Sequence, residues 1–145
     1  MKQCSVKQNG FGYSLIEVLV ALFVLALGVM GAAALQMNAL KFNQTSSVRT
    51  QATFLAYQMT DRMRANRKAA RDGAYVQAMS ASKPTGSSVA QTDIAEWLTD
   101  IEAQLPNGGD GAIAQNGDVF TVTVQWSEAR TGGSDTQQFI FETEL

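Results

Sequence analysis

The chain opens with a polar segment and continues into a long apolar run. Between Leu15 and Leu35, Glu17 is the only charged side chain. About 20 consecutive apolar residues suffice for a helix to cross a bilayer, so this run is a candidate membrane helix. Lys2 and Lys7 precede it, and positive charge at that position favours a cytoplasmic N-terminus.

The helical pattern continues beyond the apolar run. No proline occurs between residues 14 and 70, and further apolar positions are spaced by three and four residues, as on one face of a helix. They are Val48, Ala52, Leu55, Met59 and Met63. The pattern predicts one helix of about 55 residues, roughly 80 Å long at 1.5 Å per residue. Its first half is apolar on all sides and its second half has one apolar stripe.

Two glycines, Gly28 and Gly31, interrupt the apolar half. Each costs about 1 kcal/mol of helix propensity relative to alanine. They suit close packing of helices in a membrane. They equally suit a segment that bends or melts when a subunit enters an assembly.

The rest of the chain predicts a loop, a short helix and three strands. The loop covers residues 80–91, and the helix runs from about Asp93 to Leu105, with Asp93 as its N-cap and Glu96 completing a capping box. Its apolar face holds Ile94, Trp97, Leu98, Ile101 and Leu105. Pro106-Asn107-Gly108-Gly109 stops this helix.

The strands are predicted at 112–115, 118–127 and 137–144. The residue pair Asn116-Gly117 predicts a hairpin turn between the first two strands, and a Gly-rich loop over 130–135 precedes the third. In the second strand Phe120, Val122, Val124 and Trp126 alternate with more polar residues. Phe139 and Phe141 share one face of the third. The expected fold is therefore α+β, with one dominant helix packed on a three-stranded antiparallel sheet.

Composition argues against catalysis. Among 145 residues there is no histidine, and the only cysteine, Cys4, lies in the polar leader. The usual Ser-His and Cys-His nucleophilic arrangements are therefore absent. Asp110, Asp118 and Asp135 match no calcium-loop spacing, and we interpret them as solvated turn residues. We expect no enzymatic activity, no cofactor and no metal site.

Charge divides the chain into two parts. Residues 1–71 hold nine Lys/Arg and two Asp/Glu, a net +7, whereas residues 72–145 hold two Lys/Arg and eleven Asp/Glu, a net −9. This asymmetry predicts complementary packing, either between the two parts or between neighbouring subunits. The acidic part would repel phosphate, so nucleic acid is not an expected partner.

A basic cluster marks the predicted end of the long helix. It comprises Arg62, Arg64, Arg67, Lys68 and Arg71. The favoured interpretation is a solvated helix end whose cations complement the helix dipole. The alternative is a charged contact with an acidic neighbour or with carboxylates of the same chain. A local Asp61–Arg62 pair is also expected.

The sequence Gly12-Tyr13-Ser14-Leu15-Ile16-Glu17 resembles the type IV prepilin signature. The resemblance implies cleavage after Gly12 by prepilin peptidase and N-methylation of the new terminus, Tyr13, which replaces the usual Phe or Met. Cleavage there makes Glu17 the fifth mature residue, as in the family, whereas cleavage after Gly10 would make it the seventh. We therefore choose Gly12.

Glu17 is the candidate assembly residue. An isolated carboxylate in apolar surroundings must find a cation or become neutral. The resemblance implies that it pairs with the methylated terminal amine of a neighbouring subunit and so sets the register of assembly. The alternative is a carboxylate in the headgroup region with no partner. A rival interpretation of the whole segment is a secretory signal cut at Ala32-Ala33-Ala34, which Glu17 and the long helical pattern disfavour.

Three further runs resemble minor pilins of the PilV kind: residues 56–67, 105–109 and 122–126. The implied organisation is a leader at 1–12, a transmembrane or filament-core helix at 13–36, and an amphipathic half-helix with a globular part at 37–145. Implied partners are major and other minor pilins, the inner-membrane assembly machinery and a tip adhesin. The implied location is the inner membrane, in a single pass, and then the pilus on the cell surface.

The implied function is that of a minor type IV pilin, present at low copy number, which primes pilus assembly and supports tip adhesion and twitching motility. A minor pseudopilin of a type II secretion system shares the same signature and is the close alternative. A membrane-anchored binding module is the alternative from another class, and it would need neither cleavage nor Glu17.

Overall fold

The computed structural model describes residues 12, 14–129 and 132–145. The chain divides into two compact units, Met1–Leu40 and Lys41–Leu145, and helix α1 (Leu15–Ala65) has residues in both. In the first unit α1 is helical without interruption from Leu15, and Gly28 and Gly31 keep the helical conformation. The second unit, called the C-terminal unit below, contains every other element.

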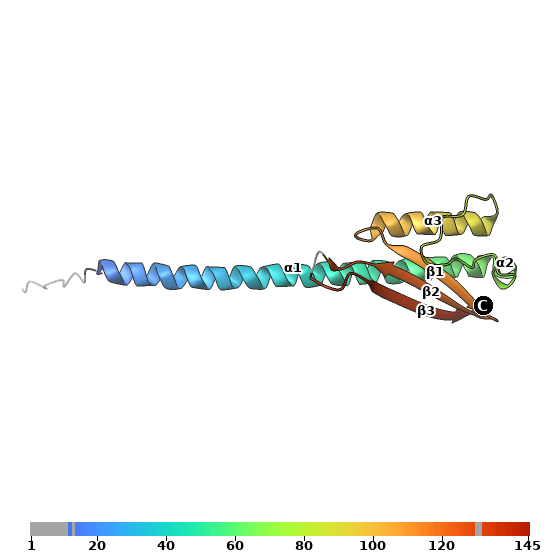
Figure 1. Cartoon of the computed structure of the whole chain (residues 1–145). Coiled ribbons are helices and arrows are strands. Elements are labelled where there is room, and N and C mark those ends of the chain that lie inside the picture. Colours follow the sequence, from blue (N-terminus) through green and yellow to red (C-terminus); the bar gives the residue numbers. More distant parts are fainter. Residues whose placement is uncertain (1–11, 13, 130–131) are drawn as a thin grey trace, which may run out of the picture. The chain divides into compact units, whose positions relative to one another are not determined.

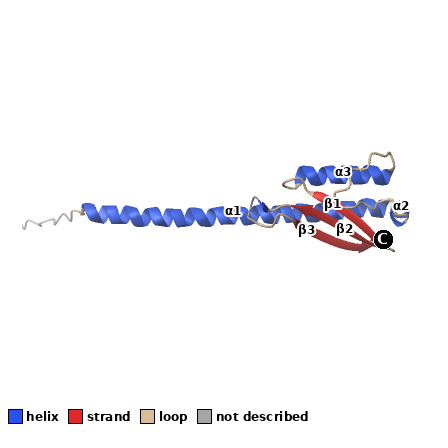
Figure 2. Cartoon of the chain, in the orientation of Figure 1, coloured by secondary structure: helices blue, strands red, loops and turns tan. Residues whose placement is uncertain are grey.

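The C-terminal unit is an α+β structure, which confirms the predicted fold class. After α1 come α2 (Arg67–Arg71), α3 (Val89–Gln104), β1 (Asp110–Asn116), β2 (Val119–Trp126) and β3 (Gln137–Glu144). The strands form one antiparallel sheet in the order β1-β2-β3, as Figures 1 and 2 show. The predicted bounds of β3 agree with the structure.

One hydrophobic core joins α1, α3 and the sheet. The predicted stripe of α1 is buried from Ala52 to Met63, and Val48 packs against the core from its margin. The predicted faces of α3 and β2 are buried as well, and Phe139 and Phe141 of β3 are partly buried against them. The helical and alternating patterns therefore identified the buried faces of α1, α3 and β2 correctly, whereas Tyr75, Ile113 and Leu145 of the same core were not predicted.

Trp97 is the central contact between α3, α1 and β1. Its side chain is fully buried, and its indole Nε1 donates a hydrogen bond to the Leu55 carbonyl oxygen at 2.9 Å. A Cβ on Gly111 would lie 2.5 Å from the Trp97 ring, so β1 can approach the indole only because glycine occupies that position.

The predicted single helix is wrong at its C-terminal end. The chain leaves the helical conformation at Asn66 (φ −119°, ψ 47°), and the short α2 follows as a separate helix. Asn66 has a low helix propensity, and its side-chain Nδ2 donates to the Tyr75 hydroxyl at 3.2 Å. A tertiary contact thus holds the residue at which the helix breaks.

The predicted N-cap of α3 is also wrong. The helix begins four residues before Asp93, at Val89, and the Ser88 side chain accepts the hydrogen bond from the Gln91 amide at 3.3 Å. The loop therefore ends at Ser88. Serine is as good an N-cap as aspartate, and Asp93 instead binds Tyr75 and Arg62.

Two details of the sheet differ from the prediction. Strand β1 is longer than residues 112–115, because Asp110 and Gly111 already pair with β2. The first hairpin exists, but Asn116 pairs with Val119, so its two turn residues are Gly117 and Asp118. Gly117 has φ +63°, which glycine adopts readily. The predicted loop at 130–135 lies partly outside the described residues.

The core packing yields a matched stability test on α1. Leu55 is fully buried, whereas its neighbour Phe54 is 61% exposed. We expect Leu55→Ala to lower the free energy of unfolding by about 2–5 kcal/mol. The control Phe54→Ala should change it by no more than about 0.5 kcal/mol. Denaturant unfolding followed by circular dichroism measures both, and equal effects would contradict this assignment of faces.

Candidate functional site: the N-terminal segment and the polar network

The N-terminal segment places its signature residues just before and within the first turn of α1. Gly12 is exposed and outside regular secondary structure, whereas Tyr13 lies outside the described residues. The Ser14 carbonyl oxygen accepts hydrogen bonds from the amides of Glu17 (2.9 Å) and Val18 (3.3 Å) and so starts the helix. The predicted cleavage position therefore precedes the helix by a few residues.

Glu17 lies in the first turn of α1 and is exposed. A carboxylate at a helix N-terminus interacts favourably with the helix dipole, by about 0.3–1 kcal/mol. Within the part of the chain that the structure describes, its carboxylate has no ion-pair partner. Local geometry thus explains how Glu17 is tolerated at this position, and its role in assembly stays a prediction.

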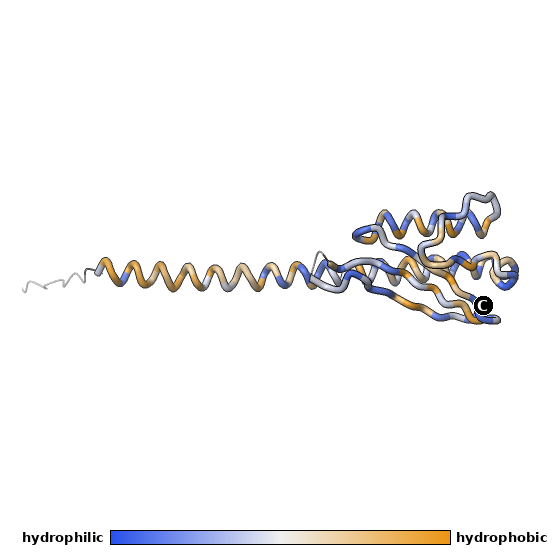
Figure 3. The backbone as a smooth tube through the Cα atoms, viewed as in Figure 1, coloured by the Kyte–Doolittle hydropathy of each residue, from blue (hydrophilic) through white to orange (hydrophobic). Residues whose placement is uncertain are grey.

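In the first unit the described part of α1 presents an apolar surface. All described side chains from Leu15 to Leu40 are exposed, and large apolar ones recur along this whole stretch. In Figure 3, which is coloured by hydropathy, this part of α1 is mostly hydrophobic. By length and composition, α1 is the one described helix able to cross a membrane. A Cβ on Gly28 or Gly31 would meet nothing within 4 Å, so neither glycine is required by contacts within the chain.

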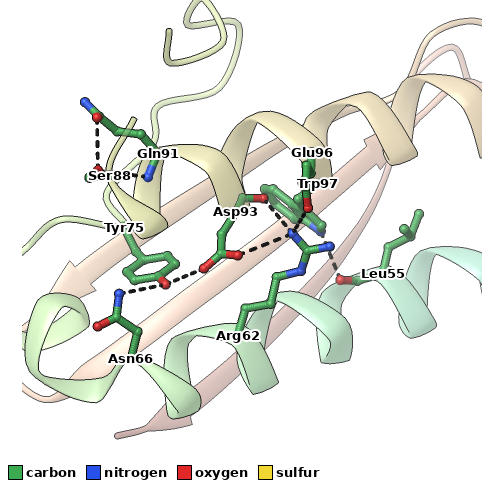
Figure 4. A network of polar contacts seen from close by, with 9 residues as sticks. All are labelled: Leu55, Arg62, Asn66, Tyr75, Ser88, Gln91, Asp93, Glu96 and Trp97. Atoms are coloured by element: carbon green, nitrogen blue, oxygen red, sulfur yellow. Dashed lines mark hydrogen bonds and ion pairs between the residues drawn. The ribbon is translucent and has the colours of Figure 1, made fainter. Parts of the chain in front are cut away.

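The C-terminal unit contains a polar network that sequence reasoning missed (Figure 4). Asp93 of α3 is its centre. It accepts a hydrogen bond from the Tyr75 hydroxyl at 2.6 Å and an ion-pair contact from Arg62 at 3.5 Å. Arg62 also reaches the Asp93 carbonyl oxygen (3.2 Å) and Glu96 (2.9 Å). The network fastens α3 and the segment after α2 to the end of α1.

Tyr75 is fully buried, and its hydroxyl lies between Asn66 and Asp93. Burial, followed by the hydrogen bond to the Asp93 carboxylate, raises the pKa of Tyr75 to about 12. Both effects disfavour the phenolate. No sequence signal marked Tyr75, because its partners come from elements distant along the chain.

Most residues of the basic cluster contact other residues of the same chain. This agrees with the alternative interpretation, a charged contact within the chain, and not with a purely solvated helix end. Arg62 binds α3, and Arg71 donates to the Leu145 carbonyl oxygen (2.9 Å) and lies 3.6 Å from Asp118. Asp61 pairs with Arg64 at 3.3 Å, so the predicted Asp61–Arg62 pair is wrong. Arg62 turns to α3 because two carboxylates meet it there.

A buried carboxylate on the sheet side completes the charge pairing. Glu128 is 6% exposed and accepts from Arg49 Nε at 3.3 Å and Trp126 Nε1 at 3.1 Å. Together with the Arg62 and Arg71 contacts, this pair joins the basic part of the sequence to the acidic part. The predicted charge complementarity is therefore present within the C-terminal unit.

The three aspartates considered for calcium do not gather. Asp110 binds the Ser80 and Gly111 amides, and Asp118 lies beside Arg71. Among the described residues, no group of three or more acidic, histidine or cysteine side chains could hold a metal ion.

Comparison with known proteins gives one match, at the N-terminus. Residues 7–33 match the family described as the prokaryotic N-terminal methylation motif. No curated protein and no solved structure matches the chain. The match contains Gly12, Tyr13 and Glu17 and ends inside the apolar part of α1.

The network yields a pH prediction. Folding raises the pKa of Tyr75 from its ordinary value, near 10, to about 12. The stability that its neutral hydroxyl contributes is therefore present below pH 10 and is lost as pH rises toward 12. Absorbance at 295 nm should show one tyrosine of the folded protein ionising near pH 12, and Tyr75→Phe should remove that step. Retention of the step in Tyr75→Phe would contradict the assignment.

The exposed apolar helix, its single carboxylate and the matched motif agree with one another, and together they identify residues 7–33 as the methylation-type signal of a type IV pilin-like or pseudopilin-like prepilin.

Proposed function

We propose that this chain is a minor type IV pilin of the PilV kind, cleaved after Gly12, methylated on Tyr13 and built into a pilus at low copy number. One observation carries the proposal: Glu17 is the only charge between Leu15 and Leu35 and stands five positions after Gly12, inside the matched motif.

Processing at Gly12 is supported by the position of that residue. It is exposed and lies before the first helical residue, Leu15, so Gly12 itself is outside the helix and open to solvent. Hydrolysis of this bond by prepilin peptidase would create a free amine on Tyr13. Methylation would keep that amine basic and therefore cationic.

Assembly would bring the cationic amine of one subunit to the Glu17 carboxylate of another. In apolar surroundings each charge needs the other, and removal of one partner from a buried pair costs about 3–5 kcal/mol. The pair therefore penalises incorrect register. Affinity would come from close van der Waals packing of the apolar side chains between Leu15 and Leu40 against other helices, because lipid tails are as apolar as these side chains and leaving them gives no hydrophobic gain.

Before assembly the same apolar surface would lie in the inner membrane, with the leader in the cytoplasm. Glu17 near one end of the run avoids the bilayer centre, where a charged side chain costs about 2.5–3.5 kcal/mol on insertion scales. After assembly the C-terminal unit would face outward on the pilus. The subunit would prime assembly together with other minor pilins, and in the finished pilus it would support tip adhesion and twitching motility.

The matched motif does not distinguish a pilus from a type II secretion pseudopilus, since both use it. The resemblance of residues 56–67 to minor pilins favours the pilus. A membrane-anchored binding module would require no cleavage at Gly12.

The first test is the mass and N-terminal sequence of the protein isolated from cells. We expect a mature chain that begins with N-methylated Tyr13. A chain beginning at Leu35 would show a secretory signal instead, and an uncut Met1 would show a simple anchor. Either result would overturn the proposal.

The second test concerns Glu17. Glu17→Ala should leave the protein inserted and cleaved but reduce its amount in sheared filaments at least tenfold, because the terminal amine of the neighbour loses its partner. Glu17→Asp keeps the charge and should recover part of the incorporation. Immunoblots of sheared and membrane fractions measure both, and incorporation of Glu17→Ala at the wild-type level would remove Glu17 from the mechanism.

A further inference from the structure

The two edges of the sheet in the C-terminal unit differ. The outer edge of β1 is occupied at its centre, where Gln77 and Ile113 form a bridge with two backbone hydrogen bonds, of 3.0 and 2.8 Å. The Gln115 side chain also donates to the Arg71 carbonyl oxygen at 3.1 Å. At the other edge, no described backbone segment pairs with the outer side of β3, which Figure 2 shows at the margin of the sheet.

Strand β3 lacks several features that usually protect a sheet edge. It pairs with β2 through all eight of its residues without a bulge, and it contains neither lysine nor proline. Alternate residues of an edge strand direct their N–H and C=O groups away from the sheet, where another strand can bind them. The backbone of β3 is therefore a template for one more strand.

Aromatic side chains lie beside this edge on the inner side. Phe141 is only partly buried, and its ring lies 4.7 Å from that of Tyr57 of α1, centroid to centroid. Tyr57 is itself 47% exposed and, with Phe54, borders a shallow hollow of about 420 Å³ on α1. An added strand with apolar side chains on its inner face would cover these aromatic groups.

On the outer side the edge is acidic. Glu142 and Glu144 are exposed and lie on the same face of β3 as Ile140, which is 57% exposed. Arg64 of α1 reaches β3 but donates to the Thr143 hydroxyl at 3.2 Å and pairs with Asp61. Among the described residues no cation pairs with Glu142 or Glu144, so a strand laid along β3 with lysine or arginine on its outer face would meet complementary charge.

We propose that β3 is the docking edge for an extended strand of another protein, apolar on its inner face and basic on its outer face. The added strand continues the antiparallel sheet, covers Tyr57 and Phe141, and places its cations opposite Glu142 and Glu144. This site involves the C-terminal unit alone, so it stands apart from cleavage at Gly12 and from the role of Glu17.

The experiment uses the full chain in detergent micelles and a synthetic peptide that alternates valine and lysine. Hydrogen–deuterium exchange of residues 137–144 is measured with and without the peptide. We expect the peptide to slow exchange of the outward-facing β3 amides and leave α3 unchanged. The double variant Glu142→Gln/Glu144→Gln, changed only at exposed positions, should bind the peptide about three- to tenfold more weakly.

Two control peptides separate strand pairing from simple charge attraction. A valine–glutamate peptide should give no protection. A valine–lysine peptide methylated on every backbone nitrogen keeps its charge but has no N–H donors, so it too should fail. Equal protection by the methylated peptide, or no protection by any peptide, would overturn the proposal. Protection that rises with protein concentration alone would overturn it in favour of pairing between copies of this chain.

Discussion

The buried stripe of α1 between Ala52 and Met63 is the surface on which the C-terminal unit is assembled. The sheet and α3 bury their own apolar faces against it, and Trp97 joins all three through its indole and its hydrogen bond to Leu55. Without that stripe the three strands would have no core, since a small sheet needs a packed partner to be stable in water.

One charged residue limits what the N-terminal segment can do. Its apolar side chains gain free energy wherever they leave water, in a bilayer or among other helices, and such burial has no preferred register. A carboxylate among them has different requirements, because it must stay at a polar boundary or meet a cation. In the proposed pilus, Glu17 would therefore convert non-directional burial into a defined arrangement of subunits.

In the C-terminal unit, too, charged side chains that need partners define the arrangement, but here the partners lie within the chain. Basic residues of α1 and α2 meet carboxylates of the acidic part of the chain: Arg49 pairs with Glu128, Arg62 with Asp93 and Arg71 with Asp118. These contacts fix how α3 and the sheet lie on α1. By contrast, the carboxylates of β3 at Glu142 and Glu144 are exposed, and no described residue pairs with them or with the outer edge of that strand. This difference in pairing distinguishes the β3 edge from the rest of the unit.

The sequence by itself determined the elements whose pattern repeats locally: the apolar helix, the buried stripe from Ala52 to Met63, the alternation of β2 and the bounds of β3. It also contained the motif at residues 7–33, because that motif is contiguous. Only tertiary structure decided the rest. Asn66 breaks the long helix where Tyr75 binds it, and Asp93 serves Tyr75 and Arg62 instead of capping α3. The physical reason is that the side chains of Asn, Asp and Arg have several partners of similar energy within reach, and packing of distant segments selects among them.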